Sequence, residues 1–260
     1  MAGIDVARHP GEVRRSIGFV AQKQVSDPMA TGEENLILSG RLQGMSRGSA
    51  RTRSRELLDR FSLGDAAGRL VKTYSGGMAR KLDVAIGLMH RPQVLFLDEP
   101  TTGLDPQARA DMWVELELMA KVEQMTVLLT THYLDEADRL ASRLAIVDHG
   151  AVVVHGTPAE LKNGLHGDAV VVELAADAAV SEAMSTLSRV RCLREVAADG
   201  QTVRARADAG ATALPQALTA LADADLRVVS ATVGRPSLDD VYLQHTGRSF
   251  TAQIPEEVAA

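Results

Sequence analysis

The chain has 260 residues, of which 45% are hydrophobic and 24% charged, a composition typical of a globular protein with its own core. Its single cysteine, Cys192, excludes an intrachain disulfide framework and a cysteine-based zinc site. The net charge of −6 argues against a general nucleic-acid-binding protein, and no apolar run approaches the roughly 18 residues that read as a membrane-spanning helix.

Charge divides the chain into two parts. Residues 1–167 hold 20 basic and 21 acidic side chains, whereas residues 168–260 hold 8 basic and 13 acidic side chains and no lysine. Two glycine-containing turns, Asn163-Gly164 and His166-Gly167, lie at the change. We therefore predict two domains, over residues 1–167 and 168–260.

Hydrophobic patterning in the first part predicts strands that alternate with helices, an order typical of an α/β fold with a parallel sheet. Thr31 is a good N-cap, because Glu33 and Glu34 follow in the first turn of the helix. The uninterrupted apolar run from Val94 to Leu97 is typical of a buried parallel strand. The expected strands are 17–21, 94–97, 126–131, 144–148 and 152–155, and the expected helices are 31–42, 46–61, 79–90, 107–124 and 134–141.

Ser75, Gly76 and Gly77 come directly before a segment whose apolar residues have helical spacing. Glycines at a helix start leave backbone N–H groups uncovered, and the Ser75 hydroxyl adds another hydrogen-bonding group. The segment is therefore suited to bind a phosphate. A flexible helix start without a ligand is the alternative interpretation of these three residues.

Polar residues follow two of the predicted strands. Asp98 and Glu99 end one apolar strand and His132 ends the next, so all three are expected at the edge of a parallel sheet where ligands bind. There Asp98 is placed to hold a magnesium ion, and Glu99 to orient or deprotonate a water molecule. The alternative is an ordinary turn, helped by Pro100 and Gly103, with a structural histidine beside it.

These features, in this order, resemble the nucleotide-binding domain of ABC transporters, and the resemblance covers residues 19–165. It implies a P-loop NTPase fold with a helical subdomain, and ATP and magnesium as ligands. Gln22 resembles the Q-loop glutamine that touches magnesium and the attacking water, and Asp98 resembles the Walker B aspartate. Glu99 resembles the catalytic base, and His132 resembles the switch histidine that senses the γ-phosphate.

The segment that resembles the family signature, LSGGQ, departs from it at two positions, with Tyr74 in place of leucine and Met78 in place of glutamine. The segment 103–105 resembles the D-loop, and the run 97–106 is close to diagnostic of the family. The resemblance implies catalytic roles for Glu99 and His132, magnesium binding by Asp98 and Gln22, and nucleotide binding by Gln22, Ser75, Gly76, Gly77, Asp98 and Asp105.

The phosphate-binding loop of the family, G-x-x-x-x-G-K-[ST], does not occur in the sequence, because none of the five lysines follows a glycine. Only 21 residues precede Gln22. We therefore expect a domain that is incomplete at its N-terminal end, either because the protein starts upstream of Met1 or because the short chain is genuine. The intact motifs after Arg14 favour the upstream start.

The last part reads as strand, helix, two strands, helix, strand, the order of a ferredoxin-like α+β domain. The Asp199-Gly200 pair predicts the hairpin between its two central strands. The expected strands are 169–174, 192–197, 202–207 and 226–233, the expected helices are 178–189 and 211–222, and a final helix covers 238–246. We expect a regulatory or dimer-supporting accessory domain.

The C-terminal segments 237–243 and 246–248 resemble those of bacterial drug-exporter ATPase subunits of the daunorubicin/doxorubicin-resistance type. This resemblance implies an ATP-hydrolysing subunit at the cytoplasmic face of the cell membrane. Its implied partners are a membrane-spanning permease subunit and a second ATPase subunit in a homo- or heterodimer, with no nucleic acid.

Two alternatives stay open. A catalytically dead partner would supply only its signature to an intact ATPase, and the missing phosphate-binding loop leads us to expect that this chain alone is inactive. A non-transport ABC ATPase of DNA repair or translation is the other alternative. The chain has neither a long insertion between Gln22 and Ser75 nor a second cassette, which are the features of those classes.

Overall fold

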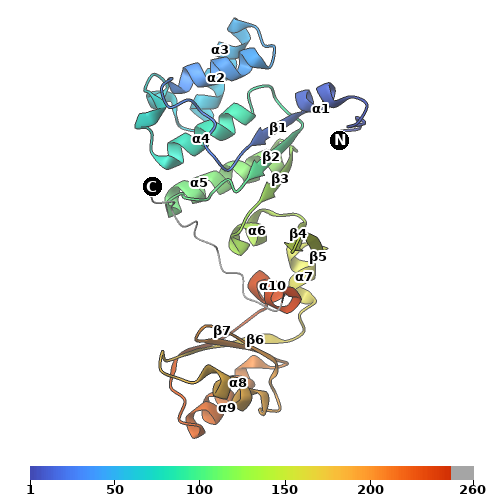
Figure 1. Cartoon of the computed structure of the whole chain (residues 1–260), viewed down its shortest axis with the longest axis vertical. Coiled ribbons are helices and arrows are strands. Elements are labelled where there is room, and N and C mark those ends of the chain that lie inside the picture. Colours follow the sequence, from blue (N-terminus) through green and yellow to red (C-terminus); the bar gives the residue numbers. More distant parts are fainter. Residues whose placement is uncertain (247–260) are drawn as a thin grey trace. The chain divides into compact units, whose positions relative to one another are not determined.

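The computed structural model describes residues 1–246, so Gly247 and Arg248 of the C-terminal motif lie outside the described residues. The chain forms two compact units, one over Met1–His132 and one from Tyr133 onward (Figure 1). The predicted domain boundary after residue 167 lies within the second unit and stays a prediction. Within residues 1–246, no helix has both the length and the apolar character needed to cross a membrane.

A three-stranded parallel sheet organises the first unit. Its strands lie in the order β1-β2-β3, and Phe19, Phe96 and Leu128 are aligned across it. The three predicted strands are confirmed, with ends that differ by one residue. Their bounds are β1 (Ile17–Val20), β2 (Val94–Asp98) and β3 (Thr126–Thr130).

Helices of the first unit start where the sequence provides caps. Thr31 and Glu34 form a reciprocal capping box, and Ser46 caps the following helix by accepting the Ser49 N–H. A short helix before β1 was not expected from the sequence. The helices are α1 (Pro10–Ser16), α2 (Gly32–Leu42), α3 (Arg47–Arg60), α4 (Gly76–Gly87) and α5 (Pro106–Glu117), with 3₁₀ turns at Gly64–Ala66 and Val71–Thr73.

Two helices of the first unit differ by three or more residues from their predicted limits. The helix predicted over 79–90 begins at Gly76, because the Ser75 hydroxyl accepts the Met78 N–H and caps it. The helix predicted over 107–124 is α-helical only to Glu117 and continues as a π-helical turn over Leu118–Val122.

The two faces of the sheet differ. Leu95 and Leu97 are buried on the side where α4 packs, whereas Phe19 and Leu128 on the opposite face are exposed. Helix α4 lies so close to β1 that a Cβ atom on Gly18 would come within 2.4 Å of the Gly87 carbonyl oxygen. Only glycine permits this approach, which fixes α4 against the strands that end in the site.

The second unit begins with elements that gather around the last helix. An antiparallel pair and two short helices share a small core with α10, formed by Ile146, Leu165, Leu238, Val241 and Tyr242. The final helix therefore packs against segments that precede residue 167. The elements are α6 (Leu134–Leu140), β4 (Leu144–Asp148), β5 (Ala151–Gly156), α7 (Pro158–Asn163) and α10 (Leu238–Thr246).

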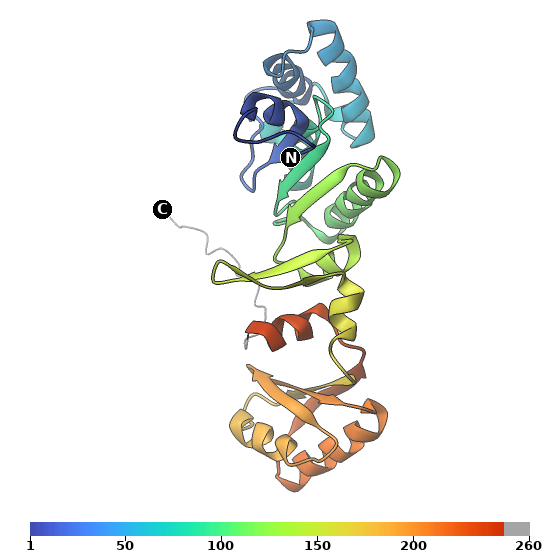
Figure 2. The same ribbon diagram turned by 90° about the vertical axis from the view of Figure 1, so that its right-hand side faces the viewer.

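The remainder of the second unit is a ferredoxin-like fold, as predicted. A four-stranded antiparallel sheet has the order β7-β8-β6-β9, and α8 and α9 cover one of its faces (Figures 1 and 2). Val170, Val203 and Leu221 are buried between the sheet and these helices. The bounds are β6 (Asp168–Leu174), α8 (Val180–Ser188), β7 (Arg194–Asp199), β8 (Thr202–Ala207), α9 (Gly210–Asp223) and β9 (Val228–Gly234).

Candidate active site

The Glu99 carboxylate is the centre of a polar cluster at the carboxyl ends of β1, β2 and β3. The Gln22 Nε2 atom donates to Glu99 Oε2 at 2.8 Å, and the Thr102 hydroxyl donates to the same oxygen at 3.2 Å. His132 Nδ1 lies 3.1 Å from Glu99 Oε1. Three residues predicted separately from the sequence are thus brought into direct contact.

Thr130 joins the acidic residues of this cluster, and the sequence analysis missed it. Its hydroxyl donates to Asp98 Oδ1 at 2.6 Å and accepts the Glu99 N–H at 3.1 Å. Asp98 and Thr130 are aligned in the β2–β3 register. A polar residue at the end of the neighbouring strand is the signal that would have identified Thr130.

Glu99 has an unusual backbone conformation, with a φ of 46°. A non-glycine residue in this left-handed region costs on the order of 1–3 kcal/mol, and such strain clusters at functional sites. Two hydrogen bonds from the Glu99 N–H, to the Thr130 hydroxyl and the Thr130 carbonyl, hold it there. In this backbone conformation the Glu99 carboxylate points toward Gln22 and His132.

Beneath the strand ends, α4 carries two buried charged residues. Burial raises the pKa of Asp83 above its ordinary value, although hydrogen bonds from Ser26 and the nearby Arg80 oppose the rise. Burial likewise lowers the pKa of Arg80, and the carboxylates of Asp83, Asp98 and Glu99 oppose that change. The sequence analysis did not assign a role to either residue.

The other predicted binding residues form a second group. Ser75 and Gly76 are exposed at the start of α4, and a Cβ atom on Gly76 would meet nothing within 4 Å. A Cβ atom on Gly77 would lie 2.9 Å from the Ala108 Cβ, so α4 and α5 touch at this point. Asp105 caps α5 by accepting the Ala108 N–H at 2.9 Å.

The structure therefore sorts the eight predicted site residues into two groups. Gln22, Asp98, Glu99 and His132 belong to the cluster at the strand ends. Ser75, Gly76, Gly77 and Asp105 lie where α4 and α5 begin. Their catalytic and binding roles stay predictions.

The cluster at the strand ends has the donor chemistry that suits magnesium. Mg²⁺ prefers oxygen ligands and is usually held by one or two carboxylates together with substrate phosphates and waters. Asp98 offers a carboxylate, and Gln22 offers an amide oxygen because its nitrogen is engaged with Glu99. Among residues 1–246, no group of three or more His, Cys, Asp or Glu residues could hold a metal by itself.

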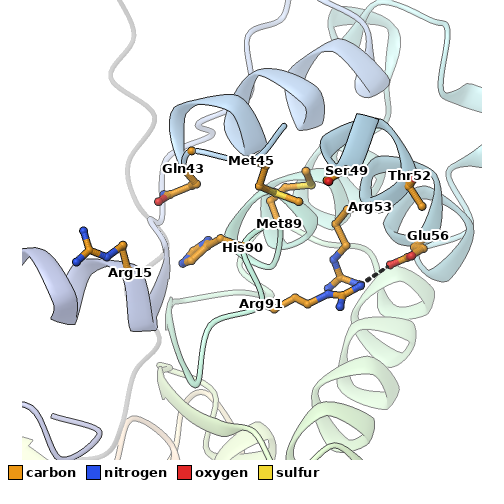
Figure 3. Close-up of a pocket in the computed structure, with 11 residues that line it drawn as sticks. Arg15, Gln43, Met45, Ser49, Thr52, Arg53, Glu56, Met89, His90 and Arg91 are labelled. Atoms are coloured by element: carbon orange, nitrogen blue, oxygen red, sulfur yellow. Dashed lines mark hydrogen bonds and ion pairs between the residues drawn. The ribbon is translucent and has the colours of Figure 1, made fainter. Parts of the chain in front are cut away.

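A cavity of about 710 Å³ lies elsewhere in the first unit, between α1, the α2–α3 segment and the end of α4 (Figure 3). Four basic side chains line it: Arg15, Arg53, His90 and Arg91. The Glu56 carboxylate accepts hydrogen bonds from Arg53 at 3.0 Å and Arg91 at 3.3 Å. The charged residues of the lining are therefore three arginines and one glutamate, and the other lining residues are histidine, polar or apolar.

Both units match known protein families. Residues 2–102 match the ABC transporter family, and residues 156–246 match the C-terminal domain of DrrA1-3-like ATP-binding proteins.

Curated relatives match over nearly the whole chain. The daunorubicin/doxorubicin resistance ATP-binding protein DrrA of Streptomyces peucetius is 44% identical over 260 residues, which cover 99% of this chain and 78% of that protein. The doxorubicin resistance ATP-binding protein DrrA of Mycobacterium tuberculosis H37Rv is 40% identical, over 95% of this chain and 75% of that protein. The linearmycin resistance ATP-binding protein LnrL of Bacillus subtilis is 32% identical, over 96% and 80%.

A solved structure shares the fold. The ATP-binding cassette MJ0796, in a dimeric post-hydrolysis state bound to ADP and Pi, superposes with a TM-score of 0.52 and 26% sequence identity. The match covers 60% of this chain and 68% of the MJ0796 chain.

Proposed function

The chain belongs to the ABC transporter ATP-binding proteins, in the group with a DrrA-like C-terminal domain, and from this we propose that it is the ATP-hydrolysing subunit of a bacterial exporter. In this proposal the subunit lies at the cytoplasmic face of the membrane and powers a separate membrane-spanning permease. The convergence of Gln22, Asp98 and His132 around Glu99 is the observation that carries it.

Glu99 acts as the base in this proposal. A carboxylate oxygen can take the proton of a water that attacks the γ-phosphate, a contribution typically worth about 10²–10⁴ in rate. Gln22 and Thr102 hold one oxygen of Glu99, and His132 lies against the other. These contacts fix the orientation of the Glu99 carboxylate. Little conformational entropy of this side chain is therefore lost when the substrate binds.

Asp98 and Gln22 would hold the magnesium ion, which supplies positive charge against the phosphate oxygens of ATP. Thr130 orients the Asp98 carboxylate through a hydrogen bond of 2.6 Å. Because Thr130 also accepts the Glu99 N–H, the metal ligand and the base are fixed relative to each other.

The start of α4 binds the nucleotide held by a second ATPase subunit in this proposal. An exposed helix N-terminus with an open Gly76 presents backbone N–H groups in its first turn, which attract a phosphate. MJ0796, which shares the fold, is a dimer bound to ADP and Pi, which supports a site shared between subunits.

The permease contacts the segment Gln22–Gly44 in this proposal. Apolar side chains are exposed along this segment, and Leu42 is 80% exposed. Such exposure is typical of a surface that docks another protein. The other exposed apolar residues of the segment are Val25, Met29 and Leu38.

The exported compounds are drug-like organic molecules in this proposal. Its support is the group of relatives, whose names refer to resistance to daunorubicin, doxorubicin and linearmycin.

The test is to express the protein from its own genomic locus together with the neighbouring genes, isolate it with any multi-span membrane protein that co-purifies, and measure ATP hydrolysis. We expect co-purification and hydrolysis for the wild type, and loss of co-purification for Leu42→Asp. Val114→Asp is the matched control, because Val114 is also exposed, at 57%, but lies on α5. A wild-type complex without ATP hydrolysis, or equal effects of the two substitutions on co-purification, would contradict the proposal.

A further inference from the structure

Arg80 lies on α4, five residues after Ser75, and is only 7% exposed. Its guanidinium group donates to backbone carbonyl oxygens at both strand ends that carry the site. At the end of β2, Arg80 Nη2 donates to the carbonyl oxygens of Asp98 at 2.7 Å and Glu99 at 3.1 Å, and Nε donates to that of Pro100 at 3.0 Å. Just after β1, Nη1 donates to the carbonyl oxygens of Ala21 at 2.5 Å and Gln22 at 3.5 Å.

One side chain therefore joins two segments that are far apart in the sequence. The segment after β1 carries Gln22, and the segment after β2 carries Asp98 and Glu99. The 2.8 Å hydrogen bond between Gln22 and Glu99 depends on the spacing of these two backbones. Arg80 holds that spacing, while its own helix begins at the exposed Gly76 of the segment proposed to bind a phosphate.

We propose that Arg80 is a positioning residue of the ATPase site, which sets the Gln22–Glu99 spacing and links it to the start of α4. This inference rests on the proposed function. A ligand that moves the N-terminus of α4 would also move Arg80, and with it the carbonyl groups of both strand ends. Arg80 thus links the start of α4, which faces the nucleotide of a second subunit in the proposed function, to Glu99, which acts on the nucleotide of its own subunit.

Arginine suits this position because its planar guanidinium presents five donors in a fixed fork. A lysine at position 80 would keep the positive charge, but its donors all sit on one nitrogen atom. It could not reach both strand ends in the same geometry. The conservative variant Arg80→Lys therefore separates the role of the fork from that of the charge.

The test measures ATP hydrolysis by the complex with the membrane protein, for Arg80→Lys and for the control Arg60→Lys. Arg60 is also largely buried, but it pairs with Glu115 and Glu123, away from the strand ends. We expect kcat to fall about 10²-fold in Arg80→Lys, because misplacement of catalytic groups by about 1 Å costs about that much. The KM for ATP should change less than about threefold, since an interaction specific to the transition state is lost.

Hydrogen exchange provides a second readout that does not depend on turnover. Arg80→Lys should speed exchange at residues 21–24 and 98–102 while β3 keeps its wild-type protection, and Arg60→Lys should change neither segment. If Arg80→Lys does not fold, Arg80→Gln takes its place with the same expectations.

The outcomes separate the two claims. Unchanged kcat in a variant whose melting temperature falls as far as that of Arg60→Lys would reduce Arg80 to a structural residue and overturn the inference. If the wild-type complex hydrolyses no ATP, the proposed function fails, and exchange still decides on Arg80. Unchanged exchange at both strand ends would overturn the inference in that case.

Discussion

Thr130 shows how a single hydroxyl can organise a site. It donates to the Asp98 carboxylate and accepts the backbone N–H of Glu99, so it fixes the metal ligand relative to the base. A hydrogen bond to a charged group is worth about 1.5–3 kcal/mol. The hydroxyl is therefore expected to matter for turnover beyond its effect on folding.

We predict that Thr130→Val lowers ATP turnover at least about tenfold, the rate equivalent of about 1.4 kcal/mol. Valine has nearly the same shape, so the loss reports the hydroxyl. Thr126→Val is the matched control, because Thr126 is exposed on the same strand but lies at its other end. Steady-state kinetics of the complex with the membrane protein would measure both variants, and equal turnover of the two would contradict the role of Thr130.

At the scale of elements, the contact between α4 and α5 distinguishes two neighbouring glycines. A Cβ atom at Gly77 would lie 2.9 Å from Ala108, whereas a Cβ atom at Gly76 would face open space. Overpacking costs about 1–3 kcal/mol, so Gly77→Ala should destabilise the fold by that amount.

Gly76→Ala should leave the melting temperature unchanged and weaken nucleotide-driven association, because its methyl group obstructs the phosphate. Thermal unfolding measures the stability of both variants, and gel filtration with ATP measures their association. An unchanged melting temperature in Gly77→Ala, or unchanged association in Gly76→Ala, would contradict the corresponding prediction.

The attachment of α4 also has a pH dependence, through Asp83. Burial raises the pKa of Asp83 in the folded state, so the folded state binds this proton more tightly than the unfolded chain does. Its contribution to the free energy of unfolding is fully present below about pH 4 and is lost as pH rises through the raised value. Asp83→Asn keeps an oxygen for the Ser26 N–H and should gain stability relative to the wild type as pH rises toward neutral.

Asp111→Asn provides the opposite case for the same measurement. Hydrogen bonds from Lys81 and Gln107 lower the pKa of Asp111, so its contribution is present above about pH 4 and disappears as pH falls. Melting temperatures should therefore be measured from about pH 2 to pH 8. The difference between Asp111→Asn and the wild type should shrink as pH falls below about 4, whereas Asp83→Asn should gain on the wild type as pH rises above about 4. A parallel response would show that the burial of Asp83 does not control its proton.

Elements were predictable where local patterning decides them. The apolar runs specify β1, β2 and β3, and the Thr31 and Ser46 caps specify the starts of α2 and α3, respectively. The start of α4 was misplaced because two glycines disfavour a helix locally, whereas the Ser75 cap and the packing on α5 favour it. Arg80 escaped prediction for a different reason, since its carbonyl partners are distant in the sequence and only the folded sheet brings them together. Thr130 did carry a signal, as a polar residue at the end of the strand next to Asp98, which the sequence analysis did not use.

At the scale of the whole molecule, the ferredoxin-like order was predictable from alternating strands and helices and from the Asp199-Gly200 turn. The attachment of α10 was not, because this helix shares its core with Ile146 and Leu165, which precede the predicted domain boundary. Periodicity shows that a helix has an apolar face but does not show which segment covers it.

The central claim is that this subunit hydrolyses ATP with Glu99 as its base, and one substitution tests it most directly. Glu99→Gln removes the proton acceptor but keeps an oxygen for the hydrogen bond from Gln22. In the complex with the membrane protein we predict that turnover falls about 10²–10⁴-fold while ATP-driven association of the ATPase subunits is preserved. Glu117→Gln, on α5 where the half-buried Glu117 pairs with the exposed Lys121, should behave as the wild type. Unchanged turnover in Glu99→Gln would contradict the account.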